Sequence, residues 1–204
     1  GISLFVVPKH RSDEGGGLVF NDVNTVGDFQ KMGQRGYCTT HLSFGDKKDC
    51  RGWLVGEPHQ GLKYMFLMMN GARIAVGRGA AAIAMAAYRA SLAYAKERPQ
   101  GRKLTSSGKK DVSEDQALII EHPDVRRMLL TQKVIVEGAL SLVLLSAKYQ
   151  DLSLTHPEEA ERKKYQYLLE LLTPVAKTYP SEKGLEAVSN GLQVLGGYGF
   201  CTDF

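Results

Sequence analysis

Arginine and glycine at two places in the sequence could hold an anionic ligand. Arg98 and Gln100 stand in ERPQGR, just past a long apolar segment. A guanidinium there could bind a phosphate, although an arginine at such a place more often serves as a surface or capping residue. The stretch GLQVLGGYGF, Gly191 to Phe200, carries a glycine pair. Because glycine allows both unusual turns and close approach, the pair is either a helix-ending turn or a surface on which a cofactor lies.

Arg73 is a third candidate because it lies within an apolar segment rich in alanine and methionine. A guanidinium in such a place must be paired or solvated. A salt bridge to a neighbouring helix would satisfy it, and so would an anionic or carbonyl-bearing ligand. The sequence favours neither interpretation.

Other motifs argue against several kinds of site. GRGAAA, residues 77–82, matches the glycine pattern of a dinucleotide-binding turn. That turn must follow a strand, whereas the residues before it have a helical pattern, so packing of small residues is the better explanation. No GKS or GKT follows any glycine cluster, which argues against a phosphate-binding P-loop. No G-x-S-x-G is present, which argues against a nucleophilic hydrolase. The histidines have no metal-binding spacing; they are His10, His41, His59, His122 and His156.

The composition is typical of a globular protein with a core. Of 204 residues, 43% are hydrophobic and 24% are charged. The net charge of +4 is small and its basic residues alternate with acids, which disfavours a nucleic-acid partner. Cys38, Cys50 and Cys201 fit no disulfide or metal pattern and predict reduced thiols in a cytoplasmic protein. The opening GISLFVVPK reads as no signal peptide, and its abrupt start predicts a piece of a longer polypeptide.

The candidate residues must be positioned by secondary structure, and the sequence predicts strands before residue 60 and helices after it. Before it, short runs rich in β-branched and aromatic residues alternate with turn signals. These runs are residues 2–7, 18–23, 39–44 and 50–55. They predict antiparallel strands that form part of a β-domain.

After residue 60 the pattern is helical. Residues 61–98 predict one long helix, whose charged side chains interrupt it too often for a membrane span. Its small residues would allow close helix contact; they are Gly71, Ala75, Gly79, Ala82 and Ala86. Residues 99–120 predict a mobile surface loop, because they are polar and aperiodic.

Three more helices are expected beyond that loop. They cover residues 121–152, 160–179 and 181–195, with a kink at Pro174 in the second of them. The predicted fold class is therefore α+β: a partial antiparallel β-domain at 1–60, followed by an antiparallel four-helix bundle at 61–204.

Six stretches in this order resemble the acyl-CoA dehydrogenase family. They are GISLFVVPK, KMGQRG, LVGEPHQGLKYMFLMMNGAR, YAKERPQGR, EHPDVRRML and GLQVLGGYGF. The long helix with MMNGAR and the helix with HPDVRRMLLTQK point to the branch that contains 3-(methylthio)propanoyl-CoA dehydrogenases. The resemblance implies that this chain holds the end of the family's middle β-domain and most of its C-terminal bundle.

The resemblance also implies roles for particular residues. The family's contacts to FAD, made across a dimer interface, would fall on Arg98, Gln100, His122, Pro123, Gln193, Val194, Leu195, Gly196 and Gly197. The stretch beside the pantetheine of CoA would be Asn70, Gly71, Ala72 and Arg73. The family's catalytic glutamate lies downstream of the GGYG segment, so no catalytic residue is expected among these 204. The chain by itself is therefore expected not to dehydrogenate an acyl-CoA.

The implied activity is α,β-dehydrogenation of an acyl-CoA thioester by FAD. Its implied partners are an electron-transfer flavoprotein, which reoxidises the flavin, and further copies of the chain in a homodimer or homotetramer. Two alternatives remain at this stage. One is a non-catalytic helical bundle for oligomerisation or interaction, and the other is a flavin oxidase or monooxygenase of the same fold.

Overall fold

The computed structural model describes residues 1–110 and 112–203. The chain divides into two compact units, Gly1–Met68 and Met69–Phe204. The first holds the strands and the second holds most of the helical sequence, so the molecule is α+β as expected.

The first unit is built from three pairs of short antiparallel strands. The strands are β1 (Leu4–Val6), β2 (His10–Ser12), β3 (Leu18–Phe20), β4 (Val23–Asp28), β5 (Thr40–Phe44) and β6 (Trp53–Val55). β1 pairs with β6, β2 with β3, and β4 with β5. The sequence prediction missed β2 and most of β4, because HRS and VNTVGD contain too many polar residues to stand out as strands.

A buried asparagine fixes the loops of this unit. Asn21 has no exposed surface, and its amide nitrogen donates to the carbonyl oxygens of Pro8 and Arg51, each at 2.8 Å. Its side-chain oxygen accepts from the Arg51 backbone N–H at 2.9 Å and from Arg11 at 3.0 Å. One side chain thus joins three separate segments by hydrogen bonds, as a buried amide requires.

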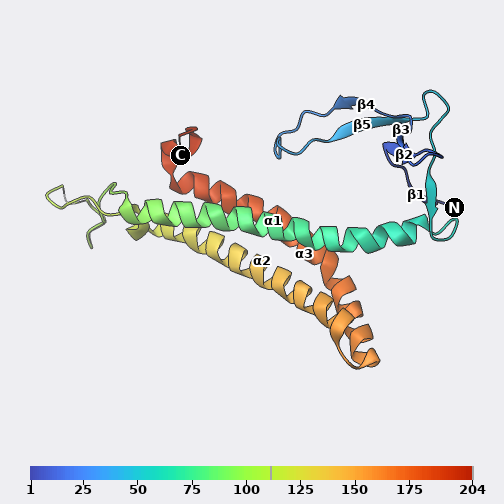
Figure 1. Cartoon of the computed structure of the whole chain (residues 1–204). Coiled ribbons are helices and arrows are strands. Elements are labelled where there is room, and N and C mark those ends of the chain that lie inside the picture. Colours follow the sequence, from blue (N-terminus) through green and yellow to red (C-terminus); the bar gives the residue numbers. More distant parts are fainter. Residues whose placement is uncertain (111, 204) are drawn as a thin grey trace. The chain divides into compact units, whose positions relative to one another are not determined.

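The helices are α1 (Gly61–Glu97), α2 (Pro123–Thr155) and α3 (Glu159–Val194), with 3-10 turns η1 (Ile119–Glu121) and η2 (Gly196–Phe200). Pro123 occupies the first turn of α2 as predicted. The expected third and fourth helices are one continuous helix, so the bundle has three long helices in the described part of the chain. α3 runs through Pro174 and Pro180, because each proline removes only one ladder bond from a long helix. Figure 1 shows α3 changing direction along its length.

Close contact between α1 and α3 uses a different face of α1 from the one predicted. A side chain at Gly77 would overlap the carbonyl oxygen of Ala176. Further along, Gly184 lies against Ala80 and Ala84, and Gly191 lies against Ala87. The predicted residues are not the ones packed within this chain: Gly71, Ala75, Gly79, Ala82 and Ala86 are all exposed. The amino-acid types were right, but alanine and glycine occur on every side of α1, so the sequence does not single out the packed side.

The loop between α1 and α2 has paired ends. Pro99 and Leu118 form an antiparallel bridge, and Gln100 N–H donates to Ala117 while Ala117 N–H donates to Gly101. These bonds hold the end of α1 beside the start of α2. The sequence predicted a mobile surface loop over residues 99–120, whereas backbone hydrogen bonds hold the two ends of this loop together.

α2 is long and apolar enough to cross a membrane by length and composition alone. Several of its side chains are buried inside the bundle, including Met128, Leu129, Gln132 and Val136. The core helix of a bundle passes the same test of length and hydropathy.

Candidate functional site

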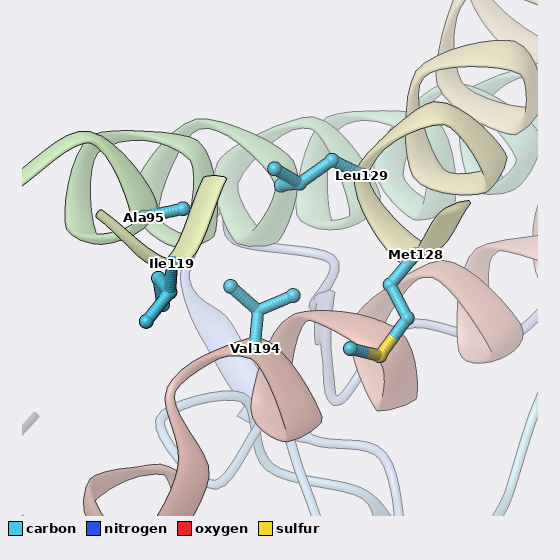
Figure 2. Close-up of a cluster of buried hydrophobic side chains, with 5 residues drawn as sticks. All are labelled: Ala95, Ile119, Met128, Leu129 and Val194. Carbon is cyan, nitrogen blue, oxygen red and sulfur yellow. The ribbon is translucent and has the colours of Figure 1, made fainter. Parts of the chain in front are cut away.

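The ends of the three helices meet in one hydrophobic cluster. Its buried members are Ala95 of α1, Ile119 of η1, Met128 and Leu129 of α2, and Val194 of α3 (Figure 2). Arg98 follows Ala95 by three residues and His122 follows Ile119 by three, while the glycine pair begins two residues after Val194. Apolar packing thus brings together most of the residues that the sequence assigned to a cofactor.

Arg98 lies half-buried at the end of α1 with an unused donor. Its Nε atom is buried and has no hydrogen-bond partner among the described residues. Its guanidinium lies over the Tyr198 ring, 5.7 Å from the ring centroid, and its carbonyl accepts from Ile119 N–H at 2.9 Å. Leaving a buried donor unpaired is unfavourable by about 1–3 kcal/mol. An anion beside Arg98 would remove that penalty.

His122 ties the loop to the first residue of α2. Its Nε2 lies 2.7 Å from the carbonyl oxygen of Gln100. Because a carbonyl only accepts, Nε2 carries the proton in this hydrogen bond. His122 is also the residue just before α2, and Pro123 follows it, so both stand at the positive end of the helix dipole. The side chain of Gln100 itself is exposed.

A basic cavity of 470 Å³ adjoins His122 and Pro123. Its other lining residues are Arg102, Lys103, Leu104, Lys110 and Glu121. The Lys103 ammonium, together with the backbone N–H of Leu118, lowers the pKa of Glu121 below its ordinary value. Glu121 is therefore a carboxylate at neutral pH, yet the lining still carries more cations than anions. The cavity suits an anionic group better than a neutral one.

The glycine segment contains glycines with different roles. Gly196 has a φ of +60°, which lets the chain turn at the end of α3. A side chain at Gly199 would overlap the carbonyl oxygen of Leu192. At Gly197, by contrast, a Cβ would meet nothing within 4 Å. The fold of this chain thus requires glycine at 196 and 199, whereas at 197 it leaves open space.

The rest of this segment splits between core and surface. Gln193 is exposed and Leu195 is half-buried, while Val194 is 4% exposed and belongs to the cluster. A ligand beside α3 could therefore reach Gln193 and the backbone after Val194, but not the Val194 side chain.

The stretch Asn70–Arg73 lies far from this site. Arg73 is half-buried and its Nη1 donates to Asn70 Oδ1 at 3.3 Å, while Gly71 and Ala72 are exposed. About 25 residues of α1 separate Arg73 from Arg98, which is roughly 37 Å at 1.5 Å per residue. The structure does not bring these two groups of residues together.

Two tyrosines at the site were not identified from the sequence. Tyr198 contacts Arg98, and its ring meets the ring of Tyr94 edge-on, with centroids 6.4 Å apart. Tyr94 precedes Arg98 by one helical turn, a spacing that puts both on one face of α1. That spacing was visible in the sequence, whereas the approach of Tyr198 depends on how η2 folds back.

Comparisons with known proteins find a matching family and several relatives. The family described as "Acyl-CoA dehydrogenase, C-terminal domain" matches residues 59–204. The 3-methylmercaptopropionyl-CoA dehydrogenase of Ruegeria pomeroyi is 41% identical over all of this chain and 33% of its own length. A butyryl-CoA dehydrogenase of Syntrophomonas wolfei is 38% identical over all of this chain and 34% of its own length. The chain therefore spans about a third of the length of these curated relatives.

The fold is also found in a solved structure of Caenorhabditis elegans ACDH-11 in complex with C11-CoA. The match has a TM-score of 0.72 and covers 94% of this chain and 29% of that one. At 22% identity this likeness supports the fold alone.

Proposed function

The chain belongs to the acyl-CoA dehydrogenase family, and on that premise we propose that the protein carrying it is an FAD-dependent acyl-CoA dehydrogenase. The reaction would remove hydrogen from the α and β carbons of an acyl-CoA thioester. The observation that carries the proposal is the buried Nε of Arg98, which has no hydrogen-bond partner among the described residues and belongs to a guanidinium lying over Tyr198, the residue after the open glycine pair. Together they offer a cation and a close surface to a phosphate-bearing cofactor.

The residues present fit the pyrophosphate end of FAD. Arg98 would donate to a phosphate oxygen, since charge-assisted bonds to guanidinium are the strong ones. Gly196 and Gly197 would lie along the cofactor, and Gln193 would reach it from α3. His122 and Pro123 would place the positive end of α2 beside it. When bound, FAD supplies the acceptor for the hydride that leaves the β-carbon.

The distance along α1 supports a shared active site between subunits. Asn70–Arg73 would lie beside the pantetheine of the acyl-CoA, roughly 37 Å from Arg98 along the helix. A single flavin and its substrate would therefore draw on these two stretches from different copies of the chain. A homodimer or homotetramer joined through the bundles accounts for that requirement, with an electron-transfer flavoprotein as the external electron acceptor.

Flavin binding tests this proposal directly. Arg98→Gln should weaken FAD binding about 10- to 100-fold, as expected for loss of a charged hydrogen bond. Arg98→Lys should recover only part of the affinity, because lysine cannot donate in the same forked geometry. Arg89→Gln, at an exposed position of the same helix, is the matched control and should bind FAD normally. Equal affinity in wild type and Arg98→Gln would contradict the assignment.

One observation favours a second candidate, an interaction module without catalysis. A groove of 670 Å³ runs along α2 and α3, lined by Leu130, Val134, Ile135, Tyr179 and other residues, and Leu130 and Val134 are mostly exposed. A bundle with such a face could serve only to bind another protein. Purified protein that is colourless, takes up no FAD and still associates would favour this candidate over the first.

A further inference from the structure

We propose that Tyr198 is a positioning residue, which holds the Arg98 guanidinium in place for an anionic ligand. The inference rests on the proposed function only for the identity of that ligand, the pyrophosphate of FAD. The arrangement itself is a property of this chain, because Tyr198 and Arg98 come from segments that fold against each other at the end of the bundle.

Two glycines bring Tyr198 to Arg98. Gly196, with its φ of +60°, turns the chain at the end of α3. Gly199 then lets η2 lie directly on the backbone of Leu192, where any side chain would overlap. Tyr198 stands between these two glycines, so its position follows from the same turn.

The ring of Tyr198 is held from the other side by α1. Tyr94 meets it edge-on, at an interplanar angle of 89°, which is a favoured geometry for two aromatic rings. Arg98 N–H donates to the Tyr94 carbonyl at 3.0 Å. Tyr94, Arg98 and Tyr198 therefore form one unit in which each member restrains the others.

A guanidinium held over a ring keeps its in-plane donors free. Attraction to the aromatic quadrupole uses the face of the cation, whereas hydrogen bonds to phosphate use the N–H groups at its edge. Arg98 Nε is buried and has no partner among the described residues, so at least one donor is available. Holding the side chain before the ligand arrives lowers the entropy lost on binding.

The test compares Tyr198→Leu with Tyr198→Phe in the protein that carries this chain. Leucine removes the aromatic face, and it should weaken FAD binding about three- to twentyfold. Phenylalanine keeps that face and should stay within about twofold of wild type. Tyr167→Leu, at an exposed position of α3, is the matched control and should not change FAD affinity.

A double-mutant cycle separates positioning from loss of structure. If Tyr198 acts through Arg98, then Tyr198→Leu should have no further effect on FAD affinity in an Arg98→Gln background. A merely structural role would weaken binding in both backgrounds to the same extent. Equal effects in the two backgrounds would therefore overturn the proposal.

A second measurement needs no flavin. The rate at which phenylglyoxal modifies Arg98, followed by peptide mass spectrometry, reports how tightly the guanidinium is held. Tyr198→Leu should raise that rate severalfold and Tyr198→Phe should leave it unchanged; an unchanged rate in Tyr198→Leu would overturn the proposal. If the wild type binds no FAD, the proposed function fails, and the modification rates alone decide the role of Tyr198.

Discussion

At the scale of single residues, a buried glutamine marks the place where three helices meet. Gln132 of α2 has no exposed surface, and its Oε1 accepts from Ser91 Oγ of α1 at 3.0 Å. Gly191 of α3 leaves room for the same oxygen, since a Cβ there would come within 3.2 Å of it. Buried polar pairs of this kind stabilise only while both partners are present.

We therefore expect Ser91→Ala to destabilise the bundle by about 1–3 kcal/mol, because it leaves Gln132 Oε1 buried without its donor. The free energy of unfolding, measured by urea denaturation and followed by circular dichroism, checks this. Ser181→Ala is the control, because Ser181 is exposed and its hydroxyl donates to the Lys177 carbonyl of the same helix; that change should stay within about 0.5 kcal/mol. A loss no larger than that of the control would mean that the pair contributes little.

An ion pair in the first unit predicts a pH dependence. Arg11 donates to both carboxylate oxygens of Asp49, at 2.9 and 2.7 Å. This hydrogen bonding lowers the pKa of Asp49 in the folded protein. A carboxyl with a lowered folded-state pKa contributes stability above its unfolded pKa of about 3.9, and that contribution is lost as pH falls through the folded-state pKa.

Asp49→Asn should therefore reduce the stability of this unit at neutral pH and make no difference at strongly acidic pH. Fluorescence of Trp53, the single tryptophan of the chain, can follow unfolding of this unit across the pH range. Arg11→Met should lose at least as much at neutral pH, because it also removes the donor to Asn21 Oδ1, and the double variant should lose no more than Arg11→Met alone. A constant gap between wild type and Asp49→Asn at every pH would contradict this account.

Residue types and spacing marked Arg98, Gln100 and the glycine segment as candidates, because they stand next to helix ends, but only the family resemblance favoured a cofactor role over capping or a turn. They were not enough for Tyr198. Its contact with Arg98 joins positions 100 residues apart, and it depends on Gly196 and Gly199 bending the chain back. No local pattern encodes such a contact.

At the scale of helices, neighbouring glycines in α1 should respond in opposite ways to the same substitution. Gly77→Ala places a methyl group against the Ala176 carbonyl of α3, and forcing two helix backbones apart should destabilise by about 1–3 kcal/mol or more. Gly79→Ala meets nothing within 4 Å and should stabilise by roughly 0.5–1 kcal/mol through helix propensity. Chemical denaturation of the two variants checks both signs. Destabilisation by both would show that the side of α1 at Gly79 is also packed, for example against another copy.

Whole helices were easier to predict than their ends and contacts. Long apolar periodicity with few breakers predicted α1, and a proline at the helix start predicted α2. The prediction split α3 near Ser181, because two prolines within seven residues usually end a helix. In the structure the helix continues through both prolines. Thr173, Ala176, Pro180 and Gly184 are buried, and their packing outweighs the missing ladder bonds. The prediction missed β2 for a different reason: three residues are too few to show the alternating pattern of a strand.

At the scale of the whole molecule, the length of α1 separates the two proposed ligand contacts. Arg73 and Arg98 lie roughly 37 Å apart along the helix, well beyond the range over which substitutions usually influence each other. Arg73→Gln should therefore raise the dissociation constant for acyl-CoA about tenfold or more and leave that for FAD unchanged. Arg98→Gln should do the reverse.

The double variant tests whether the two stretches act independently. If they serve different active sites of one assembly, its effects should equal the two single effects combined, within about twofold. Arg78→Gln, on the exposed side of α1 between them, should change neither affinity. Because a shared site between subunits needs association, diluting the protein until it dissociates should weaken FAD binding by wild type and Arg73→Gln alike. FAD affinity that stays constant through dissociation would mean that one copy holds the cofactor alone, and would contradict the shared site.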